Sequence, residues 1–311
     1  MPNEPGALVV VLGPTASGKS SLALDLAERF GGAIVNCDSL QVYRHFDIGT
    51  AKTPPAQRRA IPHFLIDIAD PLDNFTAGDY ARAARGALQE ITGRGQLPIV
   101  VGGTGLYLRA LLEGLFAGPV RNPNLRQELS AREVSRPGVL HRFLRRLDPS
   151  AAARIHRNDV KKLIRAIEVC LTARQSMTEQ FARGRDPLAG YSILRIGLDP
   201  PRAELYRRID QRVVGMFESG LTDEVRGILS MGHPRSARPF ESLGYKEALG
   251  IIDGQFTPAE AIAQAQKQTR HYAKRQMTWF RREPEVHWLP GFGDDPEIVR
   301  QAIALVALQI A

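Results

Sequence analysis

The stretch LVVVLGPTASGKSSLAL, residues 8–24, decides the fold. Five apolar residues at 8–12 predict a buried strand, and apolar residues at helical spacing come after residue 20. Between them lies the P-loop pattern, in which two glycines are closed by a lysine and a serine. A strand, this loop and a helix in that order predict an α/β fold. Its core is expected to be P-loop NTPase-like, with a parallel sheet flanked by helices.

The glycine-rich loop predicts a site for a diphosphate or a triphosphate. Its glycines let successive backbone N–H groups point into one hollow, and the following helix adds partial positive charge at its N-terminus. Lys19 contributes a full charge, and the Ser20 hydroxyl is a candidate ligand for Mg²⁺, the one expected cofactor. The pattern does not say whether the phosphate is transferred or departs. Phosphate contacts are expected from Gly13, Pro14, Thr15, Ala16, Ser17, Gly18, Lys19 and Ser20.

The composition is that of a globular protein with a basic surface. Of the 311 residues, 43% are hydrophobic and 24% are charged. Lysine and arginine outnumber aspartate and glutamate by 41 to 33, and this excess favours a polyanionic partner. Only two cysteines are present, Cys37 and Cys170, which give no disulfide framework and suit a reducing compartment. No signal or membrane segment is evident, so we expect a cytoplasmic monomer with no membrane partner.

Asp38 follows an apolar segment, residues 33–37, that predicts a second strand. A carboxylate at the carboxyl end of a strand beside the P-loop lies where ligands bind in α/β folds. The same residue could equally cap a short helix, and the sequence leaves both interpretations open.

Three more segments approach the same edge of the sheet. Residues 47–55 form a polar loop that is expected at the surface near the site. Residues 63–68 predict a strand containing Asp67, which is either a Mg²⁺-holding carboxylate or a structural acid. Residues 97–101 predict a strand that enters the glycine-rich turn 102–105, where a ligand or another backbone can approach closely.

Helix signals follow these strands. Thr76 and Asp79 have the spacing of a capping box at the start of one helix. After a predicted strand at 192–198, residues 202–219 keep helical spacing, and a further helix is expected to begin at Glu241.

The middle of the chain has a different character. Strand signals stop near residue 114, and helical patterns take over at 125–133, 139–147, 151–156 and 160–173. Between residues 121 and 185, Arg183 included, fifteen lysines and arginines face six acidic residues. This balance favours contact with nucleic acid over a merely solvated helical surface. We therefore expect a core of residues 1–114 and 188–311 and a helical insertion domain of residues 115–187.

Residues 262–282 lack acidic side chains and interleave cations with Tyr272, Trp279 and Phe280. Cations and aromatic rings on one helix suit phosphate contact and base stacking. In the plainer interpretation the rings are core and the cations are a solvated face, and both can hold at once.

Several motifs resemble those of the tRNA dimethylallyltransferases. They are GPTASGKS at 13–20, DSLQVY at 38–43, DIGTAK at 47–52, FTAGDY at 75–80 and GGTGLY at 102–107. RIHRND at 154–159 and KRQMTW at 274–279 extend the resemblance over nearly the whole chain, in the family's order. It implies transfer of the dimethylallyl group of dimethylallyl diphosphate to the exocyclic amine of an adenosine. That adenosine lies 3′ of the anticodon in tRNAs that read codons beginning with U.

The resemblance also implies roles for particular residues. Asp38 would be the base that orients the adenine amine, and Thr15 would bridge base and diphosphate. One of Arg208 and Arg212 would reach the diphosphate, and the sequence does not choose between them. The basic insertion would clamp the anticodon stem. The implied tRNA contacts are Asp38, Ser39, Leu40, Gln41, Thr104, Arg126, Lys161, Lys162, Leu163, Ile164, Arg165, Glu241, Ser242, Leu243, Gly244, Tyr245, Lys246, Lys274, Arg275, Gln276, Met277, Thr278, Trp279, Phe280 and Arg281.

Three other functions compete with this one. A P-loop kinase would move a phosphate, but no clear acid ends a strand suited to holding Mg²⁺. A prenyltransferase acting on free adenine nucleotides shares the chemistry, and the basic insertion argues instead for a macromolecular acceptor. The third is a non-catalytic RNA-binding module that uses a nucleotide as a switch.

Overall fold

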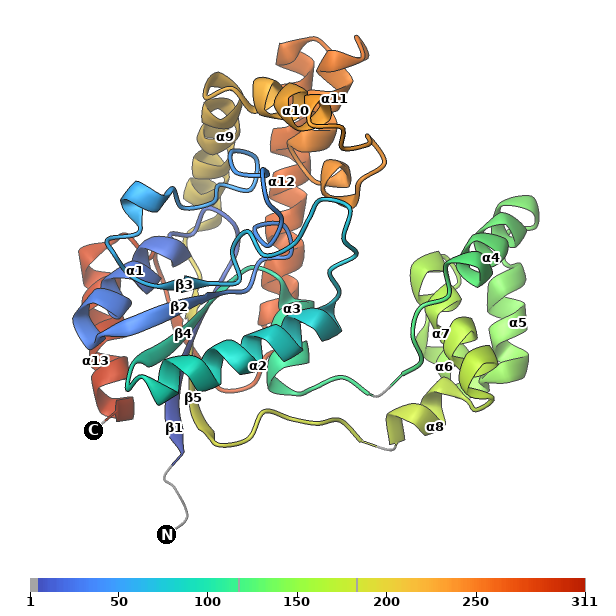
Figure 1. Ribbon diagram of the computed structural model, residues 1–311, viewed down its shortest axis with the longest axis horizontal. Helices are drawn as coiled ribbons and strands as arrows, with labels where there is room; N and C mark the ends of the chain where they lie inside the picture. Colours follow the sequence, from blue (N-terminus) through green and yellow to red (C-terminus); the bar gives the residue numbers. More distant parts are fainter. Residues whose placement is uncertain (1–4, 117, 183, 311) are drawn as a thin grey trace. The chain divides into compact units, whose positions relative to one another are not determined.

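A six-stranded parallel sheet runs through the first of the two units of the chain (Figure 1). The computed structural model describes residues 5–116, 118–182 and 184–310. The strand order is β3-β2-β4-β1-β5-β6, and every neighbouring pair is parallel. The predicted α/β class is therefore confirmed. The strands are β1 (Gly6–Leu12), β2 (Gly32–Asn36), β3 (His63–Phe64), β4 (Leu97–Gly102), β5 (Tyr191–Leu198) and β6 (Val286–Leu289).

Strand β1 lies in the middle of the sheet and is buried on both faces. Val9 pairs with Ile99 on one side and with Leu194 on the other, and none of the three is more than 5% exposed. A strand covered on both faces reads as an unbroken apolar run, and this explains the pattern at residues 8–12. The loop that follows β1 therefore opens at the carboxyl end of the central strand.

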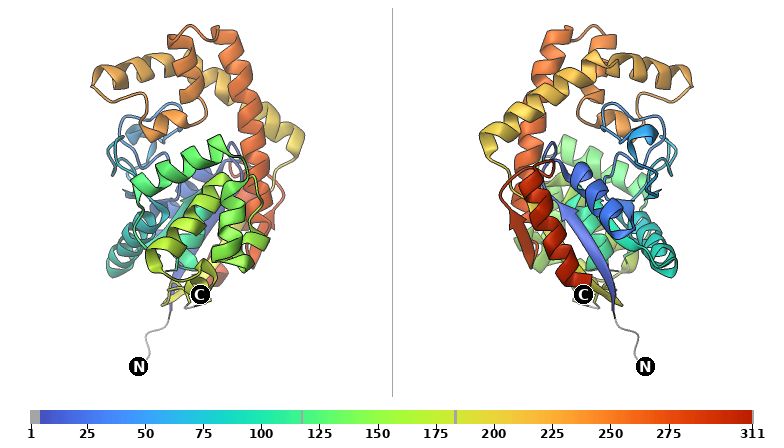
Figure 2. Two further views of the ribbon diagram at one scale, coloured as in Figure 1. Left: turned by 90° about the vertical axis from the view of Figure 1, so that its right-hand side faces the viewer. Right: turned by 90° about the vertical axis from the view of Figure 1, so that its left-hand side faces the viewer.

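Helices cover both faces of this sheet. Helices α1 (Lys19–Phe30) and α13 (Pro296–Ile310) pack against one face and against each other (Figures 1 and 2). Helix α2 (Ala77–Gly93) packs on β2 and β4, and its predicted capping box between Thr76 and Asp79 is confirmed. No described helix is both long enough and apolar enough to cross a bilayer.

A further group of helices stands at the carboxyl end of the strands. Helix α9 packs along the long helix α12, and α10 packs against α11. Phe46 from the loop after β2 contacts Phe240 and Tyr245, with ring centroids 5.1 Å and 4.8 Å apart, and so joins this group to the sheet. The elements are α3 (Gly105–Leu112), α9 (Arg202–Glu218), α10 (Leu221–Ser230), α11 (Tyr245–Ile252), α12 (Pro258–Phe280) and the 3₁₀ turns η1 (Pro55–Gln57) and η2 (Arg238–Glu241).

The second unit, Leu112–Pro187, is entirely helical in its described part. Its limits lie within three residues of the expected insertion, residues 115–187. Leucines and isoleucines of α4, α5 and α7 form its core, whereas Arg183 lies outside the described residues. Four helices match the predicted segments, and α8 was not predicted. The helices are α4 (Pro123–Ser135), α5 (Val139–Leu147), α6 (Pro149–Arg154), α7 (Val160–Ala173) and α8 (Met177–Ala182).

Two predicted elements differ from the structure. The strand expected at 63–68 keeps only two residues, because Leu65 and Asp67 have positive φ angles of 63° and 59° that end the extended backbone. The helix expected from Glu241 begins instead at Tyr245, after Gly244 turns with a φ of 87°. Both errors come from turns formed by residues that a pattern of apolar spacing does not reveal.

Candidate functional site

The glycine-rich loop wraps around the N-terminus of α1. Gly18 has a φ of 84° immediately before the helix, and a Cβ there would lie 2.7 Å from the backbone nitrogen of Gly293. Gly293 N–H in turn donates to the Ser17 carbonyl at 2.9 Å. Glycine is thus required at position 18 both by backbone angle and by close packing. The hydroxyl of Ser17 is buried and has no hydrogen-bond partner among the described residues.

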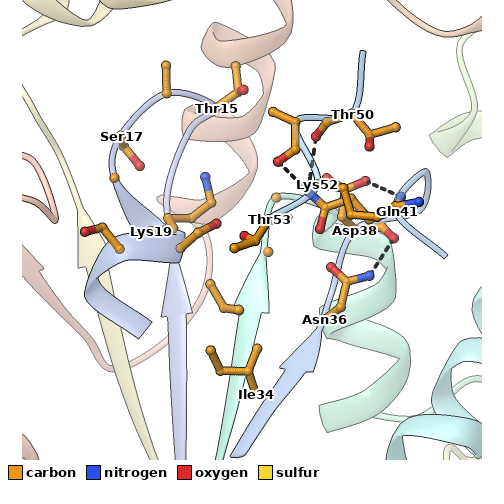
Figure 3. Close-up of a pocket in the computed structure, with 18 of the residues that line it drawn as sticks. Thr15, Ser17, Lys19, Ile34, Asn36, Asp38, Gln41, Thr50, Lys52 and Thr53 are labelled. Carbon is orange, nitrogen blue, oxygen red and sulfur yellow. Dashed lines mark hydrogen bonds between the residues drawn. The ribbon is translucent and has the colours of Figure 1, made fainter. Parts of the chain in front are cut away.

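Lys19 projects from the first turn of α1 into the space under this loop (Figure 3). Its ammonium donates to the Pro14 carbonyl at 2.5 Å. Burial lowers the pKa of Lys19 to about 7; nearby Arg212 lowers it further, while Asp38 opposes the shift. A buried cation that is costly to keep charged becomes favourable when an anion binds beside it.

A cavity of about 380 Å³ lies against the loop. Figure 3 shows Ser17 and Lys19 on one side of it and Asp38, Gln41 and Lys52 on the other. The cavity is lined by the loop, the ends of β2 and β4, the segment after residue 49, and α9 and α12. The lining side chains include Thr15, Ser17, Lys19, Ser20, Ile34, Asn36, Asp38, Gln41, Thr50, Lys52, His63, Ile66, Val101, Arg212, Tyr272 and Gln276.

Asp38 lies two residues after β2 and opens on this cavity. Its Oδ1 accepts hydrogen bonds from the backbone N–H groups of Leu40 at 2.9 Å and Gln41 at 3.4 Å. These bonds make a turn rather than a helix, and they fix the direction of the carboxylate. The short helix that Asp38 could have capped is therefore not formed at residues 39–44, and the carboxylate lines the cavity.

Gln276 of α12 joins the two glycine-rich segments. The Thr15 N–H donates to its Oε1 at 2.8 Å, and its Nε2 donates to the Gly103 carbonyl at 2.9 Å. A Cβ on Gly103 would lie 2.2 Å from that Nε2, so the close approach expected at 102–105 is made by this helix. Gln276 is only 5% exposed, and its role in the structure is to hold the loop and the turn together.

The two candidate arginines of α9 lie in different surroundings. Arg212 lines the cavity, and burial lowers its pKa while Asp38 opposes the shift. Arg208 does not line the cavity: its guanidinium binds both oxygens of Asp294, at 2.7 Å and 2.8 Å, and stacks over Phe292 at 3.6 Å. Only Arg212 is therefore available to an anion in the cavity without first breaking an ion pair.

The loop after β2 forms the opposite wall. Lys52 is 7% exposed, and its ammonium binds Asp47 at 2.5 Å, Asp67 at 2.6 Å and the Tyr43 carbonyl at 2.9 Å. Asp67 is thus occupied by a lysine, as its structural interpretation required. The polar loop therefore forms a fixed wall of the site. The sequence did not predict this wall, because residues 47–55 show no helical or strand period.

The donors suited to Mg²⁺ are few. Among the described residues no group of three or more His, Cys, Asp or Glu side chains could hold a metal. Ser20 and Asp38 do line the same cavity as the loop. Mg²⁺ commonly takes one or two protein oxygens and completes its shell with phosphate oxygens and water, so these residues fit a metal that arrives with its ligand.

The expected RNA contacts differ widely in how exposed they are. Six of them are buried: Leu163, Ile164, Gly244, Tyr245, Gln276 and Phe280, of which Gln276 lines the cavity. Tyr245, for example, donates from its hydroxyl to Glu224 at 2.5 Å and accepts from Gly49 N–H at 3.1 Å. The exposed members outside the second unit are Glu241, Lys246, Lys274, Arg275, Thr278 and Arg281; the half-buried ones are Asp38, Ser39, Leu40, Gln41, Thr104, Ser242, Leu243, Met277 and Trp279.

Two expected contacts in the second unit are part of an internal ion cluster. Arg126 binds Glu168 through two bonds of 2.8 Å and 2.7 Å, and Arg165 binds it at 2.7 Å. Burial works to raise the pKa of Glu168, but the hydrogen bonds from Arg126, Arg165 and the Asn122 N–H outweigh it and lower that pKa to about 2. Lys162 pairs with Asp159 at 2.6 Å, whereas Lys161 is exposed.

Comparisons with known proteins agree on one family. The IPP transferase family model matches residues 41–283. A tRNA dimethylallyltransferase of Solibacter usitatus is 61% identical over 300 residues, which are 96% of this chain and 98% of the relative. The tRNA dimethylallyltransferase of Koribacter versatilis is 59% identical over 96% of this chain and 97% of its own.

Solved structures give the same result. The full-length tRNA isopentenylpyrophosphate transferase of Bacillus halodurans is 37% identical, with a TM-score of 0.73 over 98% of this chain and 96% of its own. A eukaryotic dimethylallyltransferase, captured in crystallographic snapshots while acting on tRNA, is 27% identical. Its TM-score is 0.82 over 97% of this chain and 79% of that one.

Proposed function

Because this chain belongs to the IPP transferase family of tRNA dimethylallyltransferases, we propose that its cavity carries out prenyl transfer with a departing diphosphate. The protein is an enzyme: it transfers the dimethylallyl group from dimethylallyl diphosphate to the N6 amine of an adenosine in tRNA. In our proposal the acceptor is the adenosine 3′ of the anticodon in tRNAs that read codons beginning with U. The observation that carries it is the meeting of Lys19, Arg212 and Asp38 in one cavity with the glycine-rich loop.

The loop side of the cavity binds the diphosphate. The N-terminus of α1 and the unpaired Ser17 hydroxyl offer donors, and Lys19 and Arg212 offer charge. As the C–O bond of the donor breaks, its electron pair leaves with the diphosphate and negative charge grows there. Fixed cations that face this growing charge stabilise the transition state more than the ground state.

The opposite side of the cavity presents the nucleophile. The lone pair of the adenine amine forms the new bond to C1 of the dimethylallyl group, and the amine then loses a proton. Asp38 is the proposed acceptor of that proton, since its carboxylate lines the cavity and its direction is fixed by the Leu40 and Gln41 N–H groups. Thr15 lies on the loop and lines the same cavity, and its hydroxyl is the proposed hydrogen-bond link. Because an aniline-like amine is a poor nucleophile, orientation supplies much of the rate.

Mg²⁺ would be held by Ser20, with diphosphate oxygens and water completing the shell. When bound, it neutralises charge on the leaving group. The diphosphate also has cations of the protein to bind without the metal, because Lys19 and Arg212 line the same cavity.

The tRNA contacts that we retain are those with exposed charge. On α12 these are Lys274, Arg275 and Arg281, although Arg281 also lies 3.3 Å from Asp199. In the second unit we retain the exposed Lys161 and add Arg142, Arg145 and Arg157, which are exposed and have no ion pair among the described residues, in contrast to Arg126 and Arg165. Cations that form no ion pair within the protein can neutralise phosphates, and the polyanion then releases its bound counterions.

The deciding experiment offers two donors to the protein. The protein is incubated with Mg²⁺, with either an unmodified anticodon stem-loop or AMP as the acceptor, and with either labelled ATP or labelled dimethylallyl diphosphate. We expect the RNA fragment to gain the mass of the prenyl group and no phosphate. Transfer of phosphate would establish the kinase instead, turnover of AMP but not RNA would establish the nucleotide prenyltransferase, and RNA binding without a mass change would leave only the binding module.

The state of the two cysteines bears on the compartment in which the enzyme works. Both cysteines are free and buried, which fits a reducing compartment, and we propose a cytoplasmic monomer. Light scattering on the purified protein, with and without RNA, tests the monomer.

A further inference from the structure

Tyr272 is the aromatic side chain of α12 that lines the cavity. The other two rings on the basic stretch of this helix do not reach it. Phe280 is 1% exposed in the core, and Trp279 packs under the Arg109 guanidinium at 4.5 Å and against Gly105. Of the three aromatic rings that the sequence offered for base stacking, the structure therefore leaves Tyr272 for the site.

The position of Tyr272 on the helix is fixed by its neighbours. Gln276, one helical turn further on, is bonded to both Thr15 and Gly103. The guanidinium of Arg275 lies 5.7 Å from the centre of the Tyr272 ring. The ring thus lies on a helix that is bonded to the diphosphate loop through Gln276, beside an exposed cation suited to RNA phosphate.

Tyr272 also lies in the electrostatic field of Asp38. Burial raises the pKa of the Tyr272 phenol strongly, and the Asp38 charge raises it further, while Arg275 and a hydrogen bond with Thr104 oppose the shift. His63, the other ring that lines the cavity, is turned differently: its Nδ1 lies 2.8 Å from the Ile61 carbonyl at the edge strand β3. Of these two rings, Tyr272 is the one whose pKa the Asp38 charge shifts.

We propose that the Tyr272 ring is the platform on which the acceptor adenine stacks while its amine faces Asp38. An enzyme that modifies a base must take it out of its stack, and the lost stacking is commonly replaced by an aromatic side chain. The contact uses the π-face of the ring and does not need the hydroxyl. This inference rests on the proposed prenyl transfer to tRNA.

The test compares Tyr272→Ala with Tyr272→Phe in single-turnover prenyl transfer to an anticodon stem-loop. Stacking on one aromatic side chain supports a loss of about 10-fold to 100-fold in kcat/KM for RNA on removing the ring. Phenylalanine should restore most of it, and binding of dimethylallyl diphosphate alone should change little in either variant. Equal losses in both variants, or no loss in Tyr272→Ala, would overturn the platform.

A binding readout separates stacking from a structural effect. The acceptor adenosine is replaced by 2-aminopurine, which lacks the reactive amine and brightens when it leaves its stack. The wild-type complex should stay dim because the tyrosine ring quenches the extruded base, and the Tyr272→Ala complex should be several-fold brighter. Tyr206→Ala is the matched control, since Tyr206 packs against the cluster that contains Ala273 of α12 but does not line the cavity; its complex should stay dim. A Tyr272→Ala complex as dim as wild type would refute the stacking.

Failure of the inference and failure of the proposed function give different results. If the wild-type protein adds no prenyl group to the stem-loop, the proposed function fails. If it does, and only the Tyr272 comparisons come out against expectation, the reaction stands and the platform is wrong.

Discussion

The two units of this protein use buried charge in opposite ways. In the first unit, Lys19 and Arg212 are cations that burial makes costly, and each is left without a carboxylate in direct contact among the described residues. In the second unit, buried Glu168 is fully matched by Arg126 and Arg165. Buried charge that is left unmatched marks a place prepared for a ligand, whereas matched buried charge marks a structural joint.

Removing the carboxylate of the cavity should have the largest effect. Asp38→Asn keeps an Oδ1 acceptor for Leu40 N–H and so preserves the turn, but the amide cannot take a proton. We expect single-turnover transfer to fall by roughly 10²-fold to 10⁴-fold, the range for loss of a general base. RNA affinity should stay within about one order of magnitude, measured by fluorescence anisotropy.

Asp38→Ala is the companion to that variant. It removes the turn as well, so any further loss beyond Asp38→Asn measures the positioning of residues 38–41 rather than proton transfer. Unchanged turnover in Asp38→Asn would show that the carboxylate takes no part in the reaction. Its charge would then have a structural role, as the charge of Glu168 does.

The matched charge of the second unit predicts a stability effect instead. Glu168→Ala leaves two partly buried arginines facing each other, and breaking such a cluster costs about 3 kcal/mol. The free energy of opening is read from hydrogen exchange of the α4 and α7 amides. Glu128→Ala, which breaks only the exposed pair with Arg132, is the control and should cost under about 1 kcal/mol.

The same cluster has a predictable pH dependence. The pKa of Glu168 in the folded unit is lowered to about 2 from its ordinary 4.5. Its stabilisation is therefore complete above about pH 4.5 and is lost as the pH falls toward 2. Wild type should lose protection of α7 over this window, and Glu168→Ala should lose less; parallel curves would show that Glu168 does not govern the acid transition.

The sequence predicted local features of the chain better than contacts between distant residues. The strand, loop and helix at residues 8–30 are local features, so the pattern at 13–20 determined β1, α1 and the place of the cavity. The hydrogen bond between Thr15 and Gln276 joins residues 261 positions apart, and the pairing of Arg126 with Glu168 joins residues 42 positions apart. No local period in the sequence predicts such contacts. The sequence therefore did not reveal that two arginines expected from the family resemblance to contact RNA also pair with buried Glu168.

Arg208 shows the same limit within the core unit. Both Arg208 and Arg212 lie on one helix at a spacing of one turn, so α9 presents them at neighbouring positions. Only the fold brings Asp294, 86 positions away, beside Arg208. The choice between the two arginines depended on this distant acid.

The exposed cations of the second unit give the next smaller effect. Neutralising Arg142, Arg145 and Arg157 to glutamine should weaken stem-loop binding and reduce the slope of log affinity against log salt by about one per lost phosphate contact. Arg132→Gln is the control, because that arginine already pairs with Glu128 at 2.6 Å. If the Arg132 variant lowers the slope as much as each of the others, paired and unpaired cations are not distinguished by the RNA.

The smallest effect concerns a single proton on Lys19. Because its pKa in the protein is about 7, Lys19 is largely neutral at pH 8, and a bound diphosphate must draw a proton onto it. Affinity for dimethylallyl diphosphate, with no RNA present, should therefore fall as the pH rises above 7, by at most about tenfold per pH unit from this group. Titration calorimetry in two buffers of different ionisation enthalpy counts the protons taken up, and Lys19 should add up to one at pH 8 and almost none at pH 6. In Lys19→Arg the guanidinium is charged throughout, so its share of the uptake should disappear while that of the diphosphate itself remains. Equal uptake in both proteins would mean that Lys19 is already charged in the empty cavity. Burial would then not disfavour its charge, and the contrast with the charged, paired Glu168 of the second unit would fail.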